Sequence, residues 1–536
     1  MLTVLFAALL AQVPPPPPPL LVTPAPSASP SASPSASASP TNAPLSATPS
    51  SIALHPNASA RIVIGGATGV LSATLGTTLA TASVDQTAQA VTVTASATTG
   101  SDVLHVTDAS GASVDVPVRV ALDAGSLAPT LNLAITGSPV DPVWLARQLA
   151  ALVTNAAQVR PGASLTVAPF ATIAPPQPGA QSTYTVPVHI GGDPAYFDAD
   201  LSTQVTVSNL AVEPFAPPLL LYDDDPERVQ ADGLLYRARV SEGTPARLYF
   251  YHADGSAPRR VVVMLQATGE DPTEVQVIDA TAGPNLDVMS VGHAVSRDFV
   301  VQKASNEGTV VQLNGDAPLV LHDLPMTSNE GAAGSIGLQV LSGGPVTVSV
   351  VAASPGIDPT TLLGSPPLPD DGHHRTGVFS IVNFGTTSLA YTVGGPDASL
   401  VYADRNDSPP PADPASLGRD YGDYGAIHTL LFSLANPTAT PTTVYLYEKP
   451  IGGIVRSSFL VDGMLQQVGC VRVSQPYQIA AFALAPQQRY QLSVQTMTDG
   501  GSNYPLEVGI TATPPQAAAP PISAPDGCFP KPNGGL

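Results

Sequence analysis

The chain alternates apolar and polar residues over short runs, and glycine, proline or aspartate separates one run from the next. Between residues 45 and 122, the runs that predict strands are 51–54, 60–64, 91–95, 100–108 and 114–120. Strands and turns at this spacing are typical of a two-layer sandwich of about eighty residues. The sequence therefore predicts a β-sandwich over residues 45–122.

One segment follows a helical period instead. Asp141 and Pro142 supply an N-cap and a proline in the first turn of a helix. Apolar residues then recur at helical spacing as far as Pro161, and they are Trp144, Leu145, Leu149, Leu152 and Val153. Strand-like runs flank the helix, so residues 123–215 are predicted to form a small α+β domain. Trp144, the only tryptophan, is interpreted as a core residue rather than a ligand platform.

The second half of the chain contains an internal repeat. Residues 265–277 align without gaps with residues 434–446, and residues 313–327 align with residues 484–498 at nearly the same offset. Two separate blocks that share an offset predict a tandem duplication of one structural unit. The predicted copies are β-sandwiches at residues 228–354 and 373–513, with a linker at residues 355–372.

An aromatic stripe marks the first copy. Tyr249 and Tyr251 are expected on one face of a strand, with Leu248, Phe250 and His252 on the other. Such a stripe can bind sugar or peptide, but it is interpreted here as lining a core or a seam between domains.

The ends of the chain differ in composition from the parts between them. Residues 1–12 are apolar but too short to span a bilayer, and they predict a signal peptide. Residues 13–44, rich in Pro, Ser and Ala, predict a disordered stalk, and residues 514–536 form a Pro-rich tail. No later segment is predicted to be a transmembrane segment. These features predict export to the cell envelope or the extracellular space.

The net charge limits the class of binding partner, and the cysteine content allows a single disulfide bond. The net charge of −21 argues against nucleic acid, because phosphate binding requires a concentrated basic surface. The two cysteines are Cys470 and Cys528. In an exported chain a bridge between them would hold the tail against the preceding domain. Two unpaired thiols are the alternative, because sequence does not give the distance between them.

Candidate chemical groups are scattered along the chain. Ser335 lies in a Gly-Ser-Ile-Gly run that departs from the nucleophile-elbow spacing by one residue. His373 and His374 follow Asp370 and Asp371, a set of ligand types that suits a transition metal, but the group is interpreted as a solvated hinge.

Acidic groups are also candidates, because carboxylate oxygens suit calcium. None has the twelve-residue loop pattern of a dedicated calcium site. The candidate groups are Asp223 with Asp224 and Asp225, Asp193 with Asp198 and Asp200, and Asp404 with Asp407. The sequence thus assigns no catalytic, cofactor-binding or metal-binding residue, and no cofactor is expected.

Two parts of the chain resemble known groups of proteins. Residues 45–122 resemble bacterial Ig-like repeat modules through the motifs at 49–52, 91–95 and 106–112, which implies a spacer or adhesive unit. Residues 228–513 resemble a group of exported bacterial β-sandwich proteins of unassigned function. That likeness is carried by residues 233–236, 247–256, 434–437, 449–453 and 500–505, and it implies no catalytic residue.

The predicted fold class is mainly all-β, with tandem β-sandwich domains and one small α+β domain. The predicted function is that of an exported structural or interaction protein of the bacterial cell surface or envelope, not an enzyme. It would present its modules on a flexible stalk to a glycan or a cell-surface protein. A carbohydrate-binding protein and a secreted hydrolase are the alternatives. Ligand and oligomeric state stay open.

Overall fold

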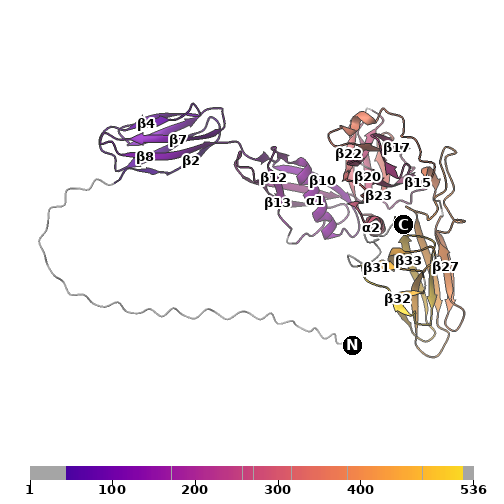
Figure 1. Cartoon of the computed structure of the whole chain (residues 1–536). Helices are drawn as coiled ribbons and strands as arrows, with labels where there is room; N and C mark the ends of the chain where they lie inside the picture. Colours follow the sequence, from indigo (N-terminus) through magenta and orange to yellow (C-terminus); the bar gives the residue numbers. More distant parts are fainter. Residues whose placement is uncertain are drawn as a thin grey trace, which may run out of the picture. The chain divides into compact units, whose positions relative to one another are not determined.

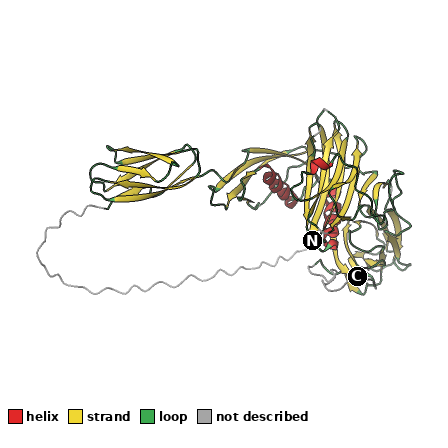
Figure 2. Ribbon diagram, turned by 45° about the horizontal axis from the view of Figure 1, so that its top comes forward, coloured by secondary structure: helices red, strands yellow, loops and turns green. Residues whose placement is uncertain are grey.

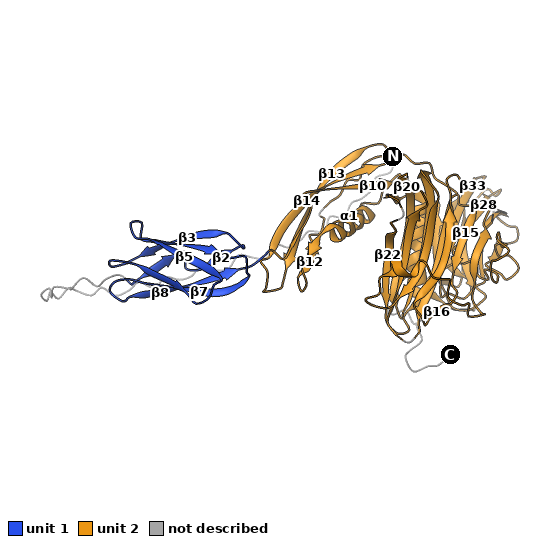
Figure 3. Ribbon diagram, turned by 90° about the horizontal axis from the view of Figure 1, so that it is seen from above, with its two compact units in different colours: residues 1–122 blue, residues 123–536 orange. Residues whose placement is uncertain are grey.

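The computed structural model describes residues 44–170, 172–255, 257–269, 271–315, 317–382, 384–473 and 475–522. The predicted signal peptide and nearly all of the predicted stalk lie outside the described residues. The chain divides into two compact units, residues 1–122 and residues 123–536 (Figure 3). Strands make up most of the described structure (Figure 2), which confirms the mainly all-β fold. No helix in the described ranges is long and apolar enough to cross a membrane.

The first unit is a sandwich of two four-stranded sheets. One sheet has the order β1 (Ser46–Thr48), β3 (Ser59–Gly65), β6 (Ala90–Ala95) and β5 (Ala80–Asp85). The other has the order β2 (Ile52–Leu54), β8 (Ser113–Val120), β7 (Gly100–Thr107) and β4 (Ser72–Leu75). Apolar residues at alternate positions fill the space between the sheets, among them Ile62, Leu104 and Val116. The runs predicted to be strands form β2, β3, β6, β7 and β8. Strands β4 and β5 consist largely of Ser, Thr and Ala, so they give little hydrophobic alternation.

A long sheet runs through the second unit. Its order is β12 (Ser164–Val167), β13 (Gln181–Gly191), β14 (Ala199–Asn209), β10 (Thr130–Thr136), β21 (Gly308–Leu313), β20 (Thr273–Asn285), β23 (Gly331–Ser342), β18 (Ala246–Asp254), β15 (Leu219–Asp223) and β25 (Thr376–Ser380). Strand β16 (Arg228–Val229) also pairs with β18, and a separate two-stranded pair joins β9 (Gly125–Ser126) to β11 (Gln158–Val159).

The sheet is continuous across the boundary predicted near residue 215. Strand β10 pairs antiparallel with β21, with Ile135 opposite Thr309. The Thr136 hydroxyl donates a hydrogen bond to the carbonyl of Asn306 over 2.7 Å. The predicted α+β segment and the first predicted sandwich therefore share one sheet, because each supplies an edge strand that pairs with the other.

Helix α1 (Pro142–Ala156) packs on the β10–β14 part of this sheet (Figure 1). The Asp141 carboxylate accepts a hydrogen bond from the backbone N–H of Val143 and caps the helix. Trp144, which is 2% exposed, packs in the cluster that also contains Leu149. The predicted helix and the core position of Trp144 are confirmed.

A four-stranded sheet packs against the long sheet and forms the second layer of the sandwich predicted at residues 228–354, called the first sandwich below. Its order is β17 (Gly233–Val240), β24 (Val346–Ala353), β19 (Arg259–Ala267) and β22 (Leu319–Met326). Leu248, Phe250 and Val263 lie in the core between this sheet and the long sheet. The segment predicted as a linker contains a short 3-10 helix, η1 (Pro359–Leu362). Leu362 and the residue after it pack against the other face of the four-stranded sheet.

The second sandwich consists of two five-stranded sheets. One has the order β26 (Thr386–Thr392), β28 (Ile427–Ala435), β33 (Arg489–Met497), β30 (Val455–Val461) and β31 (Met464–Val471). The other has the order β27 (Ala398–Tyr402), β34 (Leu506–Thr511), β29 (Thr442–Pro450), β32 (Tyr477–Leu484) and β35 (Ala517–Ala518). Their shared core includes Phe432, Leu446 and Val508.

Strand pairings in the two sandwiches correspond. The ladders β19–β22, β20–β21 and β20–β23 of the first recur as β28–β33, β29–β32 and β29–β34 in the second. Two registers follow the offsets of the sequence alignment, the second of them two residues before the block that begins at residue 313. Leu265 opposite Leu319 corresponds to Leu434 opposite Tyr490, and Val275 opposite Val311 corresponds to Val444 opposite Phe482.

A second helix, α2 (Val288–Ser305), was not predicted. It begins at the Asp287 cap and ends at Asn306, whose backbone is left-handed with φ 55°. It follows β20, at the position where the second sandwich has the β30–β31 hairpin. The helix packs against β20 and β23 of the first sandwich and β30 and β33 of the second. It is therefore buried on several sides and rich in valine, so its sequence lacks the single apolar stripe that predicts a helix.

Candidate functional site

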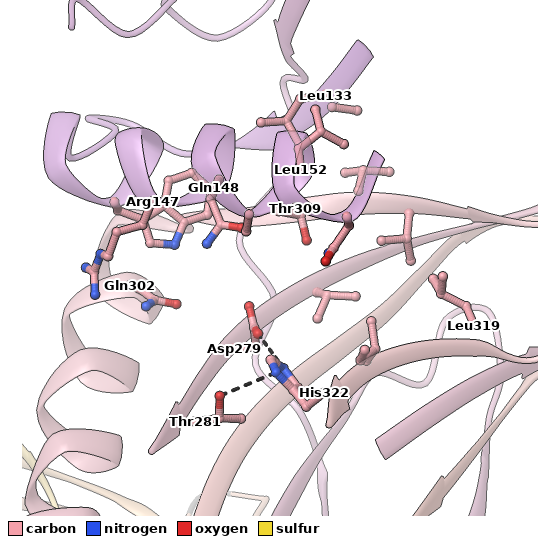
Figure 4. Close-up of a pocket in the computed structure, with 18 of the residues that line it drawn as sticks. Leu133, Arg147, Gln148, Leu152, Asp279, Thr281, Gln302, Thr309, Leu319 and His322 are labelled. Atoms are coloured by element: carbon pink, nitrogen blue, oxygen red, sulfur yellow. Dashed lines mark hydrogen bonds and ion pairs between the residues drawn. The ribbon is translucent and has the colours of Figure 1, made fainter. Parts of the chain in front are cut away.

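A cleft of about 630 Å³ lies where α1 and α2 face β10, β20, β21 and β22 (Figure 4). Its lining combines an apolar floor with planar polar groups. The side-chain amides are those of Asn132, Gln148, Asn155, Gln302 and Gln312. Such a mixture, apolar walls with a few placed polar groups, is typical of a small-molecule site.

The helical spacing of residues explains which side chains of α1 line the cleft. Its buried face holds Leu145 and Leu149 against the sheet. Gln148 and Leu152, four residues apart, lie together on the neighbouring face and line the cleft. Arg147 reaches the same space from beside them (Figure 4). The packing of α1 therefore fixes where its polar residues lie.

One face of strand β20 is apolar in its first part and polar in its second part. Val275 and Val277 lie on the face that belongs to the sandwich core. Asp279 and Thr281 continue the same alternation, so they extend that face where it opens into the cleft. His322 reaches them from β22 (Figure 4).

The imidazole of His322 is held from two sides. Its Nε2 lies 2.7 Å from Oδ2 of Asp279, and its Nδ1 lies 3.4 Å from the Thr281 hydroxyl. The side chains of His322 and Asp279 are 19% and 17% exposed. A carboxylate beside an imidazole fixes the ring orientation and its proton position. Nε2 is thereby engaged with Asp279, and Nδ1, whose contact with Thr281 is long, is the ring nitrogen that a ligand in the cleft could reach.

Apart from His322 Nε2, which faces the Asp279 carboxylate, two buried polar atoms of lining residues lack a hydrogen-bond partner among the described residues. They are the indole Nε1 of Trp144 and the amide Oε1 of Gln302. Buried polar atoms in native proteins are nearly always paired, because an unpaired one costs about 1–3 kcal/mol. A ligand with hydroxyl groups offers the missing acceptor and donor.

The structure brings together two groups that the sequence had left separate. Strand β15 pairs with β25, with Asp223 opposite Thr376, so the acidic triplet meets the histidine pair. His374 lies between two carboxylates, with Nε2 2.5 Å from Glu227 and Nδ1 2.6 Å from Asp371. Partial burial lowers the pKa of His374, but the hydrogen bond to Asp371 and the charge of Glu227 outweigh it and raise the pKa.

The charged groups of this cluster pair with one another inside the protein. The backbone N–H of Asp371 donates to Asp225 over 2.8 Å. Beneath it, Asp223 and His252 form a fully buried pair 3.1 Å apart. No group of three His, Cys, Asp or Glu in the described parts of the chain is arranged to hold a metal ion. Asp223 faces His252, Asp225 accepts a backbone N–H, and Asp224 lies 3.8 Å from Arg375.

The other acidic candidates lie apart from the cleft. His189 stands between Asp200, at 2.8 Å, and Asp198, at 4.0 Å, all on the surface. Asp193 and Asp404 accept hydrogen bonds within their own turns.

The remaining candidates are buried or covalently engaged. Tyr249 stacks on Tyr424 with ring centroids 6.4 Å apart, which confirms that the stripe lines a seam. Ser335 is fully buried in β23, opposite Tyr249, and does not stand on a strand-to-helix turn. Cys470 is disulfide-bonded, while Cys528 lies outside the described residues.

Sequence reasoning did not single out Asp279, Gln302 or His322. A signal was present in β20, where polar residues occupy positions that the alternation assigns to a core. Without the partner strand and the two helices, such residues are indistinguishable from the end of a buried strand.

No protein-family model matches the chain, and no curated protein matches it. Among solved structures it is similar to Lac15 from a marine microbial metagenome, with 11% identity, a TM-score of 0.11, and 80% of this chain and 75% of that one covered. It is also similar to the CBM22-1–CBM22-2 tandem of Paenibacillus barcinonensis Xyn10C, with 7% identity, a TM-score of 0.12, and coverage of 53% and 91%. A third is Fet3p, a multicopper oxidase that functions in iron import, with 8% identity, a TM-score of 0.09, and coverage of 76% and 69%. Likeness this weak transfers no function.

Proposed function

We propose that this chain is an exported interaction protein that binds a neutral glycan in the cleft between α1, α2 and β22. The observation that carries the proposal is the set of side-chain amides around an apolar floor, with buried polar atoms of Trp144 and Gln302 left unpaired. The first unit and the segment before it would then serve as the spacer.

Sugar chemistry suits this lining. Each hydroxyl of a sugar both donates and accepts, and a planar amide or carboxylate offers matching donors or acceptors. The cleft also offers Leu133, Leu152 and Leu319, against which the C–H face of a sugar ring can pack. Arg147 opposes two carboxylates of the lining, Asp279 and Asp298, and Asp298 is already paired with Arg297. Neither sign of charge dominates, which favours an uncharged polyol over a strongly charged ligand.

The test uses the full chain and a glycan array that includes xylan, cellulose and chitin oligosaccharides, followed by calorimetry on any hit. Gln148→Ala and Gln302→Ala should each weaken binding about tenfold, because each removes hydrogen bonds to the ligand. Thr154→Ala is the matched control, since Thr154 is exposed on α1 and does not line the cleft. Equal binding by all three variants, or no glycan bound by the parent, contradicts the proposal.

A hydrolase is the second candidate, and the oriented His322–Asp279 pair is the observation that favours it. The same oligosaccharides, incubated with the protein and separated by chromatography, distinguish the two. Shortened products that disappear in His322→Ala support hydrolysis. Intact oligosaccharides that remain bound support a binding protein.

A further inference from the structure

A second pocket of about 510 Å³ lies on the other side of α2, between the two sandwiches. Arg247 reaches it from β18, and Lys303 reaches it from the last turn of α2. Phe215 and Phe384 give it apolar walls, while Thr429 and Gln495 add polar groups from the second sandwich.

The charge of this pocket is unbalanced. Its two charged lining residues are both cations, and no Asp or Glu is among the described residues that line it. This occurs in a protein whose net charge is −21. Neither Arg247 nor Lys303 forms an ion pair with a carboxylate in the described parts of the chain.

Arg247 is 3% exposed, and not all of its guanidinium nitrogens have a hydrogen-bond partner among the described residues. Its Nη1 donates to the carbonyl of Gly425, and its Cζ lies 4.9 Å from the centre of the Phe299 ring. Its Nε is buried and has no hydrogen-bond partner among the described residues. The edge of a guanidinium that carries Nε is one that binds an oxyanion side-on.

Lys303 is desolvated in the same space. Its Nζ lies 4.9 Å from the centre of the Phe215 ring. Burial and the neighbouring Arg247 charge lower the pKa of Lys303 to about 8, and burial lowers the pKa of Arg247 to about 9. Both groups are therefore still mainly cationic at pH 7. A buried cation without a counter-ion is costly, and aromatic faces offset only part of that cost.

We propose that this pocket binds a small organic anion whose carboxylate or phosphate lies between Arg247 and Lys303 and whose apolar body packs against Phe215 and Phe384. The bound oxyanion would supply the missing partner of Nε and the missing counter-charge of both cations. The site is separate from the glycan cleft and does not depend on it.

Calorimetry on the full chain at pH 7 and low salt tests the inference with three probes: benzoate, inorganic phosphate and uncharged benzamide. Benzoate should bind and benzamide should not, because the anionic group makes the principal contacts. Failure of benzoate to bind overturns the inference, whether or not phosphate binds.

Two variants separate a ligand site from a structural role. Lys303→Met keeps the apolar stem but removes the charge, and it should weaken benzoate binding about tenfold to a hundredfold, the loss of one charge-assisted hydrogen bond. It should also raise the urea midpoint of unfolding, because it removes an uncompensated buried charge. Arg297→Met, which removes a cation from the same helix outside the pocket, should leave benzoate binding unchanged.

Arg247→Met, if the variant folds, should also weaken benzoate binding. Should it not fold, Lys303→Met still decides the matter, since Lys303 is at the edge of the helix rather than in the sandwich core. Unchanged benzoate affinity in Lys303→Met, or equal losses in Lys303→Met and Arg297→Met, overturns the inference.

Discussion

The packing of α2 between the two sandwiches makes Gly292→Ala an informative perturbation. In an isolated helix this change stabilises by about 1 kcal/mol, because alanine has the higher helix propensity. In this structure a Cβ at position 292 would lie 2.0 Å from the carbonyl oxygen and 2.3 Å from the nitrogen of Gly500. Both are backbone atoms, so no side-chain rotation relieves the overlap.

The magnitude follows from the difference between these effects. Overpacking typically costs about 1–3 kcal/mol, and a clash with backbone belongs at the upper end. Subtracting the gain of about 1 kcal/mol in propensity leaves a net destabilisation of about 2 kcal/mol. The displacement would also disturb the bond between His293 Nδ1 and Asp499, which measures 2.6 Å.

Urea unfolding followed by tryptophan fluorescence measures this effect, because Trp144 is the only tryptophan and lies in the second unit. Gly292→Ala should lower the midpoint. Gly364→Ala is the matched control, since nothing lies within 4 Å of its added Cβ, and it should change stability by less than about 0.5 kcal/mol. A midpoint for Gly292→Ala at or above that of the parent would refute the described packing of α2.

Three further predictions concern the second unit. Leu145→Ala, at a fully buried position, should cost about 2–5 kcal/mol in the same unfolding assay, and a loss below 1 kcal/mol would contradict the packing of α1. Asp141→Ala should cost about 1 kcal/mol through loss of the N-cap, whereas Asp141→Asn should recover most of it. His374→Gln should lower stability by at most about 1 kcal/mol at pH 5–6, because the partners of His374 are partly exposed. Because the pKa of His374 is raised and that of Asp371 is lowered on folding, this contribution should fade as pH rises through the raised pKa of His374, above its ordinary value of about 6.5, and as pH falls below about 4. Thermal unfolding from pH 3 to pH 9 measures it, and a difference from the parent that grows towards pH 9 would contradict the assignment.

Local pattern determined much of the architecture. Alternation located strands of the sandwich at residues 45–122 and the two faces of β18, where Leu248 and Phe250 enter the core. The Asp141 cap and the spacing of Trp144 and Leu149 located α1. These features follow from the sequence because they depend on side-chain periods of 2 and 3.6 residues and on nearest neighbours along the chain. The aligned repeats predicted a duplicated unit, but they did not give its strand pairings, such as Val444 opposite Phe482.

Only the tertiary structure decided the rest. The pairing of β10 with β21 joins segments more than 170 residues apart, and α2 is stabilised by burial against elements of both sandwiches rather than by an amphipathic stripe. Long-range pairing and burial depend on which surfaces meet, and no local period records that. For the same reason the sequence identified neither His322 beside Asp279 nor Arg247 beside Lys303. Each pair exists only because folding brings distant side chains together and removes their water.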